Sequence, residues 1–152
     1  GELLVSLDSR EQQMLRGKAR SEVEIAAAKA ASNVQRDFAR VSHEIAKADE
    51  ARALESEKKF AKSVSQTELD QLRLAVEKTR FEITNAEEEQ TLARLTLRLK
   101  EQELDLASHK LELRQIVAPF PGVVAQRYRR LGEWVQPGEK VLLVDDLLAT
   151  GG

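Results

Sequence analysis

Apolar and polar residues follow a helical period through most of this chain. Glycine and proline are both absent between Gly17 and Pro119, and the residues in that stretch are good helix formers. Apolar positions recur there every three or four residues, which is the spacing along one face of an α-helix. The stretch from Lys18 to Ala118 is therefore predicted to be helical.

A second helix is predicted to start near the middle of this stretch. Residues 65–68, Ser-Gln-Thr-Glu, have the form of a capping box, and Val64 and Leu69 are placed on either side of it as a hydrophobic staple. The same S-x-x-E spacing occurs at residues 21–24, so it can arise by chance. The segment 62–65 also lies midway between Asp8 and Val117, which bound the helical stretch, and this favours a turn there and two helices of similar length.

Each predicted helix carries an apolar seam for the other. In the first helix the seam residues are Val23, Ala27, Ala30, Val34, Phe38, Val41, Ile45 and Ala48. In the second helix they are Leu92, Leu95, Leu99, Leu106, Leu113 and Ile116, with Gln102 and His109 in the same register. Nearer the turn, a similar but out-of-phase set consists of Leu69, Leu72, Val76 and Ile83. A phase slip at residues 84–91 therefore predicts a local change of supercoil.

Three further leucines, Leu97, Leu104 and Leu111, widen the apolar stripe of the second helix beyond a two-helix seam. One interpretation is that leucine is simply a good helix former and that some of these side chains are exposed. The other is that neighbouring copies or another domain cover them. On the second interpretation these three residues form a candidate self-association face.

Short apolar runs between glycines and prolines follow Leu113 and are typical of strands. Residues 1–8 and 138–145 also share one pattern, Gly-Glu followed by apolar residues and Asp. A strand at residues 3–7 is predicted to extend one at residues 141–144 in a single small β-domain. Its predicted turn and core residues are Pro119, Gly122, Gly132, Trp134, Val135 and Gly138, with Trp134 filling the core.

The predicted fold class is α+β, with a long antiparallel two-helix coiled-coil hairpin inserted between the two halves of a small β-domain. Residues 1–8 form the first half of that domain in this interpretation, and residues 116–148 form the second half. Residues 9–115 form the hairpin, with its tip near 62–65. Residues 149–152 are a tail.

This order of elements resembles the HlyD-type membrane fusion proteins, also called periplasmic adaptor proteins. The likeness rests on residues 1–8, which lead directly into helix, on residues 116–124, Ile-Val-Ala-Pro-Phe-Pro-Gly-Val-Val, and on residues 132–138, which resemble the family's G-x-x-V-x-x-G turn. It covers practically the whole chain, and the order of the motifs is more specific than any one of them. The resemblance implies that the β-domain is a lipoyl-like (barrel-sandwich) domain.

The resemblance also implies a function: a non-catalytic periplasmic adaptor subunit of an export or efflux system. The partners it implies are an inner-membrane transporter of the ABC or RND type and an outer-membrane channel of the TolC type. Several copies, a hexamer in well-known family members, would pack side by side into a tube. The expected location is the periplasm, with anchoring to the inner membrane through segments absent from this chain.

The family's channel-docking motif, an Arg, a Leu four residues on and a Ser seven further, is incomplete here. Ser65 stands at the Ser position, whereas Lys58 and Leu54 stand at the Leu and Arg positions. A partner contact at the tip is still expected, through Ser63, Val64, Ser65, Glu68 and Leu69.

Composition argues against several other kinds of partner and site. The 26 acidic and 24 basic residues are well mixed and give a net charge of −2, so no nucleic-acid partner is expected. There is no cysteine, and the only two histidines, His43 and His109, fall far apart in a hairpin, so no metal site or cofactor is expected. The run Glu87–Glu89 is interpreted as a solvated face instead of a catalytic carboxylate pair. The basic cluster at residues 127–130 is expected to solvate a strand edge or to lie near a partner subunit.

Two other functions fit parts of the pattern. A coiled-coil scaffold or tether with a β-domain cap would have the same helices and no role in transport. A lipoyl or biotinyl carrier would present a modified lysine on the turn between its half-motifs. The helical insertion replaces that turn, which makes the carrier the least favoured interpretation.

Overall fold

The computed structural model of this chain describes residues 1–61 and 63–146. Lys62, in the predicted tip, and residues 147–152, which include the predicted tail, lie outside the described residues. The elements in chain order are β1 (Leu3–Ser6), α1 (Arg10–Ala31), α2 (Val34–Lys59), α3 (Gln66–Glu112), β2 (Gln115–Val117), β3 (Gly122–Arg127) and β4 (Leu142–Asp146). They form two compact units, a helical unit of residues 17–105 and a strand unit made of the residues on either side of it.

The predicted α+β fold class with one lipoyl-like β-domain is wrong. The chain is mostly helical, at 66%, and its strands form two separate two-stranded sheets. The predicted extension of the strand at 141–144 by the strand at 3–7 does not form, because β1 pairs with β2 and β3 pairs with β4. The described residues therefore make no closed barrel-sandwich.

The first sheet joins the two flanks of the helical segment. β1 runs antiparallel to β2, with Leu3 opposite Val117 and Ser6 opposite Gln115. The Leu7 amide extends the ladder by donating to the carbonyl of Arg114 at 2.8 Å. The chain just before α1 and the chain just after α3 are thereby held side by side within the strand unit.

The second sheet depends on a close approach at Gly122. A Cβ atom there would lie 2.3 Å from the carbonyl oxygen of Asp145 on β4, so only glycine fits without a shift of the backbone. Gly132 and Gly138, in the connection from β3 to β4, have φ angles of +85° and +83°, which other residues rarely adopt. Gly132 and Gly138 thus lie in the connection between the strands, whereas Gly122 lies in strand β3 itself.

The predicted β core does not form. Trp134, expected to fill it, is 86% exposed, and every residue of β3 is exposed. Pro119 is also exposed, and Val135 is half-buried. A two-stranded sheet with no second layer cannot enclose a large side chain, which explains why the tryptophan stays in solvent.

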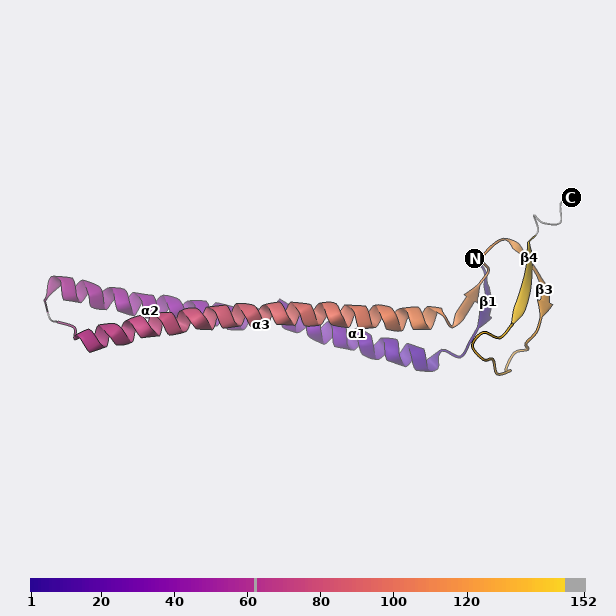
Figure 1. The fold of residues 1–152 in the computed structure, drawn as a ribbon, viewed down its shortest axis with the longest axis horizontal. Helices are drawn as coiled ribbons and strands as arrows, with labels where there is room; N and C mark the ends of the chain where they lie inside the picture. The colour runs from indigo at the N-terminus through magenta and orange to yellow at the C-terminus, as the bar shows by residue number, and fades with distance from the viewer. Residues whose placement is uncertain (62, 147–152) are drawn as a thin grey trace. The chain divides into compact units, whose positions relative to one another are not determined.

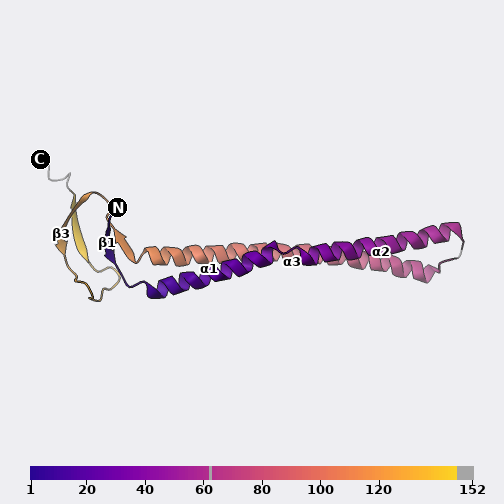
Figure 2. The ribbon, with the colours of Figure 1, turned by 180° about the vertical axis from the view of Figure 1, so that it is seen from behind.

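In the helical unit, α1 and α2 together form one arm that lies antiparallel beside α3 (Figures 1 and 2). The polar contacts across the pair join residues whose numbers sum to nearly the same value, as antiparallel pairing requires. These contacts are Glu22 with Lys100, Asn33 with Gln90, Arg36 with Gln90, Arg40 with Glu87, His43 with Thr79, and Glu50 with Arg73.

The first arm is interrupted at Ser32 and Asn33, which the sequence pattern did not predict. α1 ends at Ala31, and Asn33 stands at the N-cap position of α2 without a side-chain capping bond. Its side-chain oxygen instead accepts a hydrogen bond from Gln90 of α3. The sequence predicts an irregularity at residues 84–91 of the second helix, whereas in the structure α3 is continuous there and the break lies in the opposite arm.

The seam along α3 is not the one predicted. Apart from Ala75 and Ser108, its buried and half-buried residues keep an unbroken alternation of three and four, namely Leu69, Leu72, Val76, Thr79, Ile83, Ala86, Gln90, Ala93, Leu97, Lys100, Leu104, Ala107 and Leu111. The leucines predicted for the lower seam are all more than half exposed, namely Leu92, Leu95, Leu99, Leu106 and Leu113. The first arm contributes mainly alanines, with Ala26, Ala30 and Ala39 buried. The helices thus meet through small residues, and a line of large leucines is left outside.

Candidate functional site

The α2–α3 turn is the first candidate site, and it begins where α2 ends. Lys58 and Lys59 lie in the last turn of α2, where positive charge is favourable against the helix dipole. Phe60 follows as the C-cap with extended backbone, and its amide donates to the carbonyl of Ser56 at 2.9 Å. The Phe60 side chain is 71% exposed. The turn therefore presents an aromatic ring to solvent next to two basic residues.

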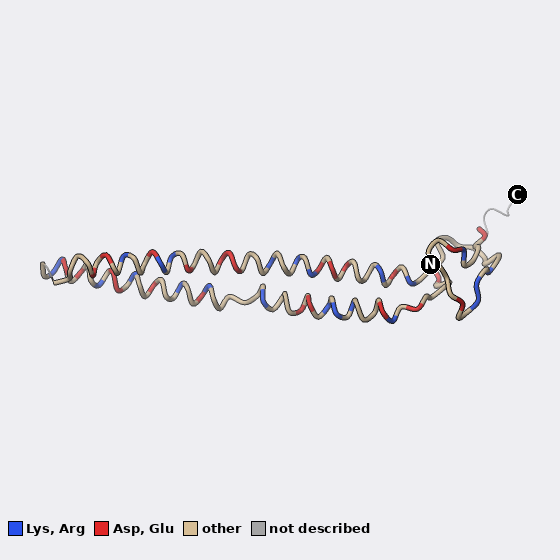
Figure 3. The backbone as a smooth tube through the Cα atoms, turned by 60° about the horizontal axis from the view of Figure 1, so that its bottom comes forward, with Lys and Arg blue, Asp and Glu red and all other residues tan. Residues whose placement is uncertain are grey.

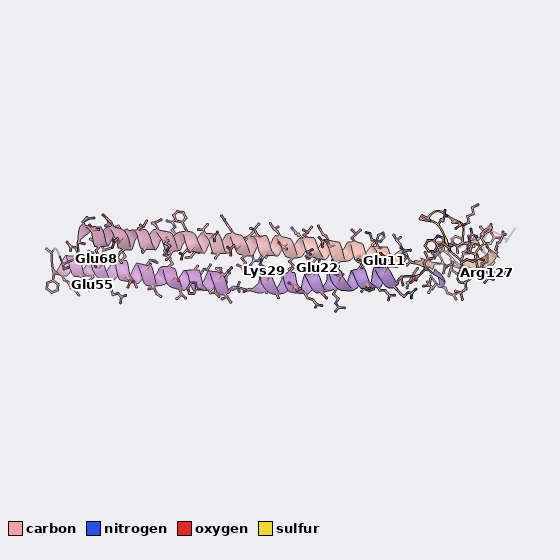
Figure 4. The ribbon with its side chains drawn as sticks, turned by 90° about the horizontal axis from the view of Figure 1, so that it is seen from below. Glu11, Glu22, Lys29, Glu55, Glu68 and Arg127 are labelled. Atoms are coloured by element: carbon pink, nitrogen blue, oxygen red, sulfur yellow. The ribbon has the colours of Figure 1, made fainter. Side chains whose placement is uncertain are left out.

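The start of α3 closes the turn with the predicted cap. The hydroxyl of Ser65 accepts a hydrogen bond from the Glu68 amide at 3.2 Å, as a capping box requires. The Glu57 carboxylate of α2 accepts a bond from the Val64 amide, also at 3.2 Å. These two bonds attach both ends of the turn to the helices that flank it. Glu55 and Glu68 mark this end of the helical pair in Figure 4.

The residues predicted for a partner contact at the tip divide into two groups. Ser63, Ser65 and Glu68 are exposed and available to a partner. Leu69 is only 7% exposed and Val64 is half-buried, so both contribute mainly to packing. The largest exposed apolar side chain of the described turn, Phe60, was missed. An aromatic residue directly after a helix-ending Lys-Lys pair is the sequence signal that could have found it.

The three leucines of the predicted self-association face lie on the inner side of α3. Leu97, Leu104 and Leu111 are half-buried and continue the inner seam that includes Gln90 and Lys100, which contact the first arm. The exposed leucines Leu92, Leu95, Leu99, Leu106 and Leu113 lie on the opposite, outer face. A self-association surface on α3 must therefore use the second set.

Electrostatics in the helical unit centre on Lys100. Its ammonium lies 2.7 Å from a Glu103 carboxylate oxygen and 2.8 Å from a Glu22 oxygen (Glu22 is labelled in Figure 4). The hydrogen bonds to Glu103 and then to Glu22 raise the pKa of Lys100 to about 12. The same contact lowers the pKa of Glu22. In the strand unit, the side-chain and backbone hydrogen bonds from Arg10 lower the pKa of Asp8 to about 2.

Other charged and polar groups form contacts between the two arms. Glu87 accepts from Arg40 of α2 at 3.1 Å, and His43 lies 3.0 Å from the Thr79 hydroxyl within the seam. His109 is exposed beside Glu112. Among the described residues, no group of three or more His, Asp or Glu side chains could hold a metal ion. Positive and negative charges are interspersed along both arms (Figure 3).

No helix within the described ranges is long and apolar enough to span a membrane.

The basic cluster at residues 127–130 contacts the β3–β4 connection. Arg129 forms an ion pair with Glu139, and the Arg130 amide donates to the Glu133 carboxylate at 3.0 Å. Next to the cluster, Leu131 is fully exposed. Arg127, on β3, is labelled in Figure 4. The cluster is thus partly used to order a loop.

No protein family, curated protein or solved structure matches the chain. Function must therefore be argued from the arrangement of the residues.

Proposed function

We propose that this chain is a non-catalytic connector: the periplasmic adaptor (membrane fusion) subunit of an export or efflux system. In this role it links an inner-membrane transporter of the ABC or RND type to an outer-membrane channel of the TolC type. It works in the periplasm as one copy of a homo-oligomer. The resemblance of its end motifs and helical insertion to HlyD-type adaptors is one support for the proposal.

The single observation that carries the proposal is the exposed turn of a long antiparallel helical pair. α3 has 47 residues, so it spans about 70 Å at 1.5 Å per residue. The chain runs along α1 and α2, presents Phe60, Ser63 and Ser65 at the turn, and returns along α3. A helical pair of this length with an exposed aromatic residue at its turn is suited to present a contact to a partner at that turn.

Photo-crosslinking at Phe60 tests the proposal. Benzoylphenylalanine replaces Phe60 in the protein within its own cells, and trapped partners are identified by mass spectrometry. Phe81, on α3 and 70% exposed, is the matched control because it is equally accessible but far from the turn. The proposal predicts an outer-membrane channel trapped from position 60 and not from position 81. Recovery of the chain alone from position 60, at normal expression, would overturn it.

A coiled-coil scaffold or tether without a transport role is the second candidate. One observation favours it: the strands form two open sheets, with Trp134 in solvent, where an adaptor's strand domain would be closed. Deleting the chain from its cells separates the two functions. If cells without the chain no longer export a substance that the parent cells export, the adaptor is supported. If export is unchanged and partner proteins are mislocalised, the tether is supported.

A further inference from the structure

A second leucine series runs along the outer face of α3. Leu92, Leu99, Leu106 and Leu113 follow one another at intervals of seven, and their side chains are 63%, 53%, 56% and 63% exposed. Leu95, also 53% exposed, lies between the first two on the same face. α3 is uninterrupted as far as Glu112, and the Leu113 amide still donates to the His109 carbonyl at 3.0 Å. The leucines therefore form one line on a single helix.

The first arm does not cover this line. It contacts α3 through the inner seam, where Glu22 reaches Lys100 and Asn33 reaches Gln90. Ala93 is 8% exposed, whereas its neighbour Leu92 is 63% exposed, so the two faces are distinct even at adjacent residues. Four leucines at heptad spacing are the pattern of a two-stranded coiled coil, and here the second strand must come from elsewhere.

We propose that a second copy of this chain covers the outer leucine face, with the two α3 helices parallel and in register. The charges beside the leucines carry the choice of partner. In a parallel coiled coil the residue before a core position pairs with the residue five positions on in the other helix. Arg98 then meets Glu103 of the second copy, and Asp105 meets Lys110 of the second copy.

Both pairs have opposite charge and occur twice in the dimer. Arg98, Asp105 and Lys110 form no ion pair with any residue that the structure describes, so they are available for these contacts. Glu103 keeps its bond to Lys100 and has further acceptor capacity. The outer face is therefore complementary to itself in charge as well as in shape.

Two polar core positions favour the parallel orientation. Gln102 and His109 stand on the same outer line, at the positions where leucine is missing. In a parallel dimer Gln102 faces its own copy, and the two amides can exchange donor and acceptor. His109 likewise faces its copy, and one neutral ring can donate to the other. In an antiparallel dimer each would face a leucine and lose its hydrogen-bond partner, which is costly.

This inference does not depend on the proposed transport role. Purified chain in solution tests it, whereas the transport proposal is tested in cells. Sedimentation equilibrium of the full chain should show a concentration-dependent dimer. A chain that stays monomeric at millimolar concentration overturns the inference.

The leucine face is tested by the double variant L99Q/L106Q. It removes two core leucines from each copy, so dimer affinity should fall at least about a hundredfold. The control V41Q/I45Q changes two apolar residues of α2 that are similarly exposed, at 59% and 57%, and do not lie on α3. Dimer affinity of the control should be unchanged. If both variants weaken the dimer equally, the outer line is not the interface.

Exchanging the charges at positions 105 and 110 tests whether the two α3 helices of the dimer run parallel. D105K alone places like charges together twice in the parallel dimer, so its affinity should fall by about tenfold. The double variant D105K/K110D restores opposite charges and should restore the affinity. In an antiparallel dimer Asp105 lies near Arg98, and Lys110 lies near Glu89, so the double variant would be weaker than either single variant. That outcome overturns the parallel arrangement.

Discussion

The ammonium of Lys100 on α3 lies 2.8 Å from a carboxylate oxygen of Glu22 on α1, across the helical pair. Lys100 is the one charged residue in the α3 seam given above, and its side chain is 29% exposed. A charged residue in a seam favours the one register in which it finds its partner. The pair therefore helps to fix which part of the first arm lies beside which part of α3.

The pH dependence of this contact is the first prediction. The pKa of Lys100 is raised to about 12, so its contribution to stability is complete below its ordinary value of 10.5 and is lost as the pH rises towards 12. The pKa of Glu22 is lowered, so its contribution is present above 4.5 and is lost as the pH falls below that value. Thermal unfolding followed by circular dichroism should show a melting temperature that falls at both extremes.

The variant E22Q isolates that contact. It should flatten the decrease in melting temperature above pH 10.5 that Lys100 produces, because one of its two carboxylate partners is gone. The control E24Q changes an exposed glutamate that pairs only with Arg20 of its own helix. A control curve that flattens as much as the E22Q curve would show that the cross-helix contact is not responsible.

The capping bond of Ser65 is the second prediction. S65A removes the hydroxyl that accepts from the Glu68 amide, so the free energy of unfolding should fall by about 1 kcal/mol. The control is S21A, which lies in a second S-x-x-E but inside α1, where no cap is needed. Alanine is the better helix former there, so S21A should be neutral or stabilising. Equal losses in urea unfolding would contradict the assignment of the helix start.

The break at Ser32 and Asn33 yields the third prediction. The Asp37 amide makes the first bond of α2, to the Asn33 carbonyl at 2.9 Å. The amides of Val34, Gln35 and Arg36 precede it and have no partner within the helix. They should therefore exchange with deuterium much faster than amides in the middle of α1 or α2. Uniform protection from residue 28 to residue 40, measured by NMR, would mean that the first arm is one unbroken helix.

Trp134 provides the fourth prediction. It is the only tryptophan and is 86% exposed, so its fluorescence should match tryptophan in water and should change little in emission wavelength when the chain unfolds. Iodide should quench it nearly as well as it quenches the free amino acid. A blue-shifted, protected emission in the native chain would mean that a core forms around it.

Local features of the fold could be predicted from the sequence. The Ser65 cap, the positive φ of Gly132 and Gly138 and the strand at residues 142–146 depend on residues close together in the chain. A hydroxyl two or three residues before a helical amide, or a glycine in a tight turn, has few alternatives. These features therefore did not depend on how distant segments pair.

The seam of α3 could not be predicted from α3 alone. Leu97 and Leu104 belong to one series with alternating spacing, and Leu92 and Leu99 belong to another. Both series satisfy the helical period, and from residue 92 onward the outer series has more leucines. The choice depends on the first arm, whose buried residues are alanines that approach α3 closely. The prediction assumed that the larger side chains form the seam, and it therefore assigned the wrong face of α3 to the contact with the first arm.

Strand pairing and the break in the first arm were missed for related reasons. The likeness between residues 1–8 and 138–145 suggested that these segments meet. Instead β1 pairs with β2, the strand that follows the helical segment in the sequence. Ser32 and Asn33 are not strong helix breakers. Asn33 stands at the N-cap position of α2, and its side chain accepts a hydrogen bond from Gln90 of α3, which is distant in the sequence. Neither the pairing of β1 with β2 nor the contact of Asn33 with Gln90 can be predicted from residues close together in the sequence.

The assignment of two faces to α3 is the claim on which the seam, the candidate interface and the proposed connector all depend. Because the chain has no cysteine, L92C and A93C place one thiol on each face at adjacent positions. The rate of reaction with a water-soluble disulfide reagent is measured at a concentration low enough to keep the chain monomeric. The account predicts that the thiol at position 92 reacts as fast as in urea and that the thiol at position 93 reacts many times more slowly. Equal rates in the folded chain, or faster reaction at position 93, would contradict it.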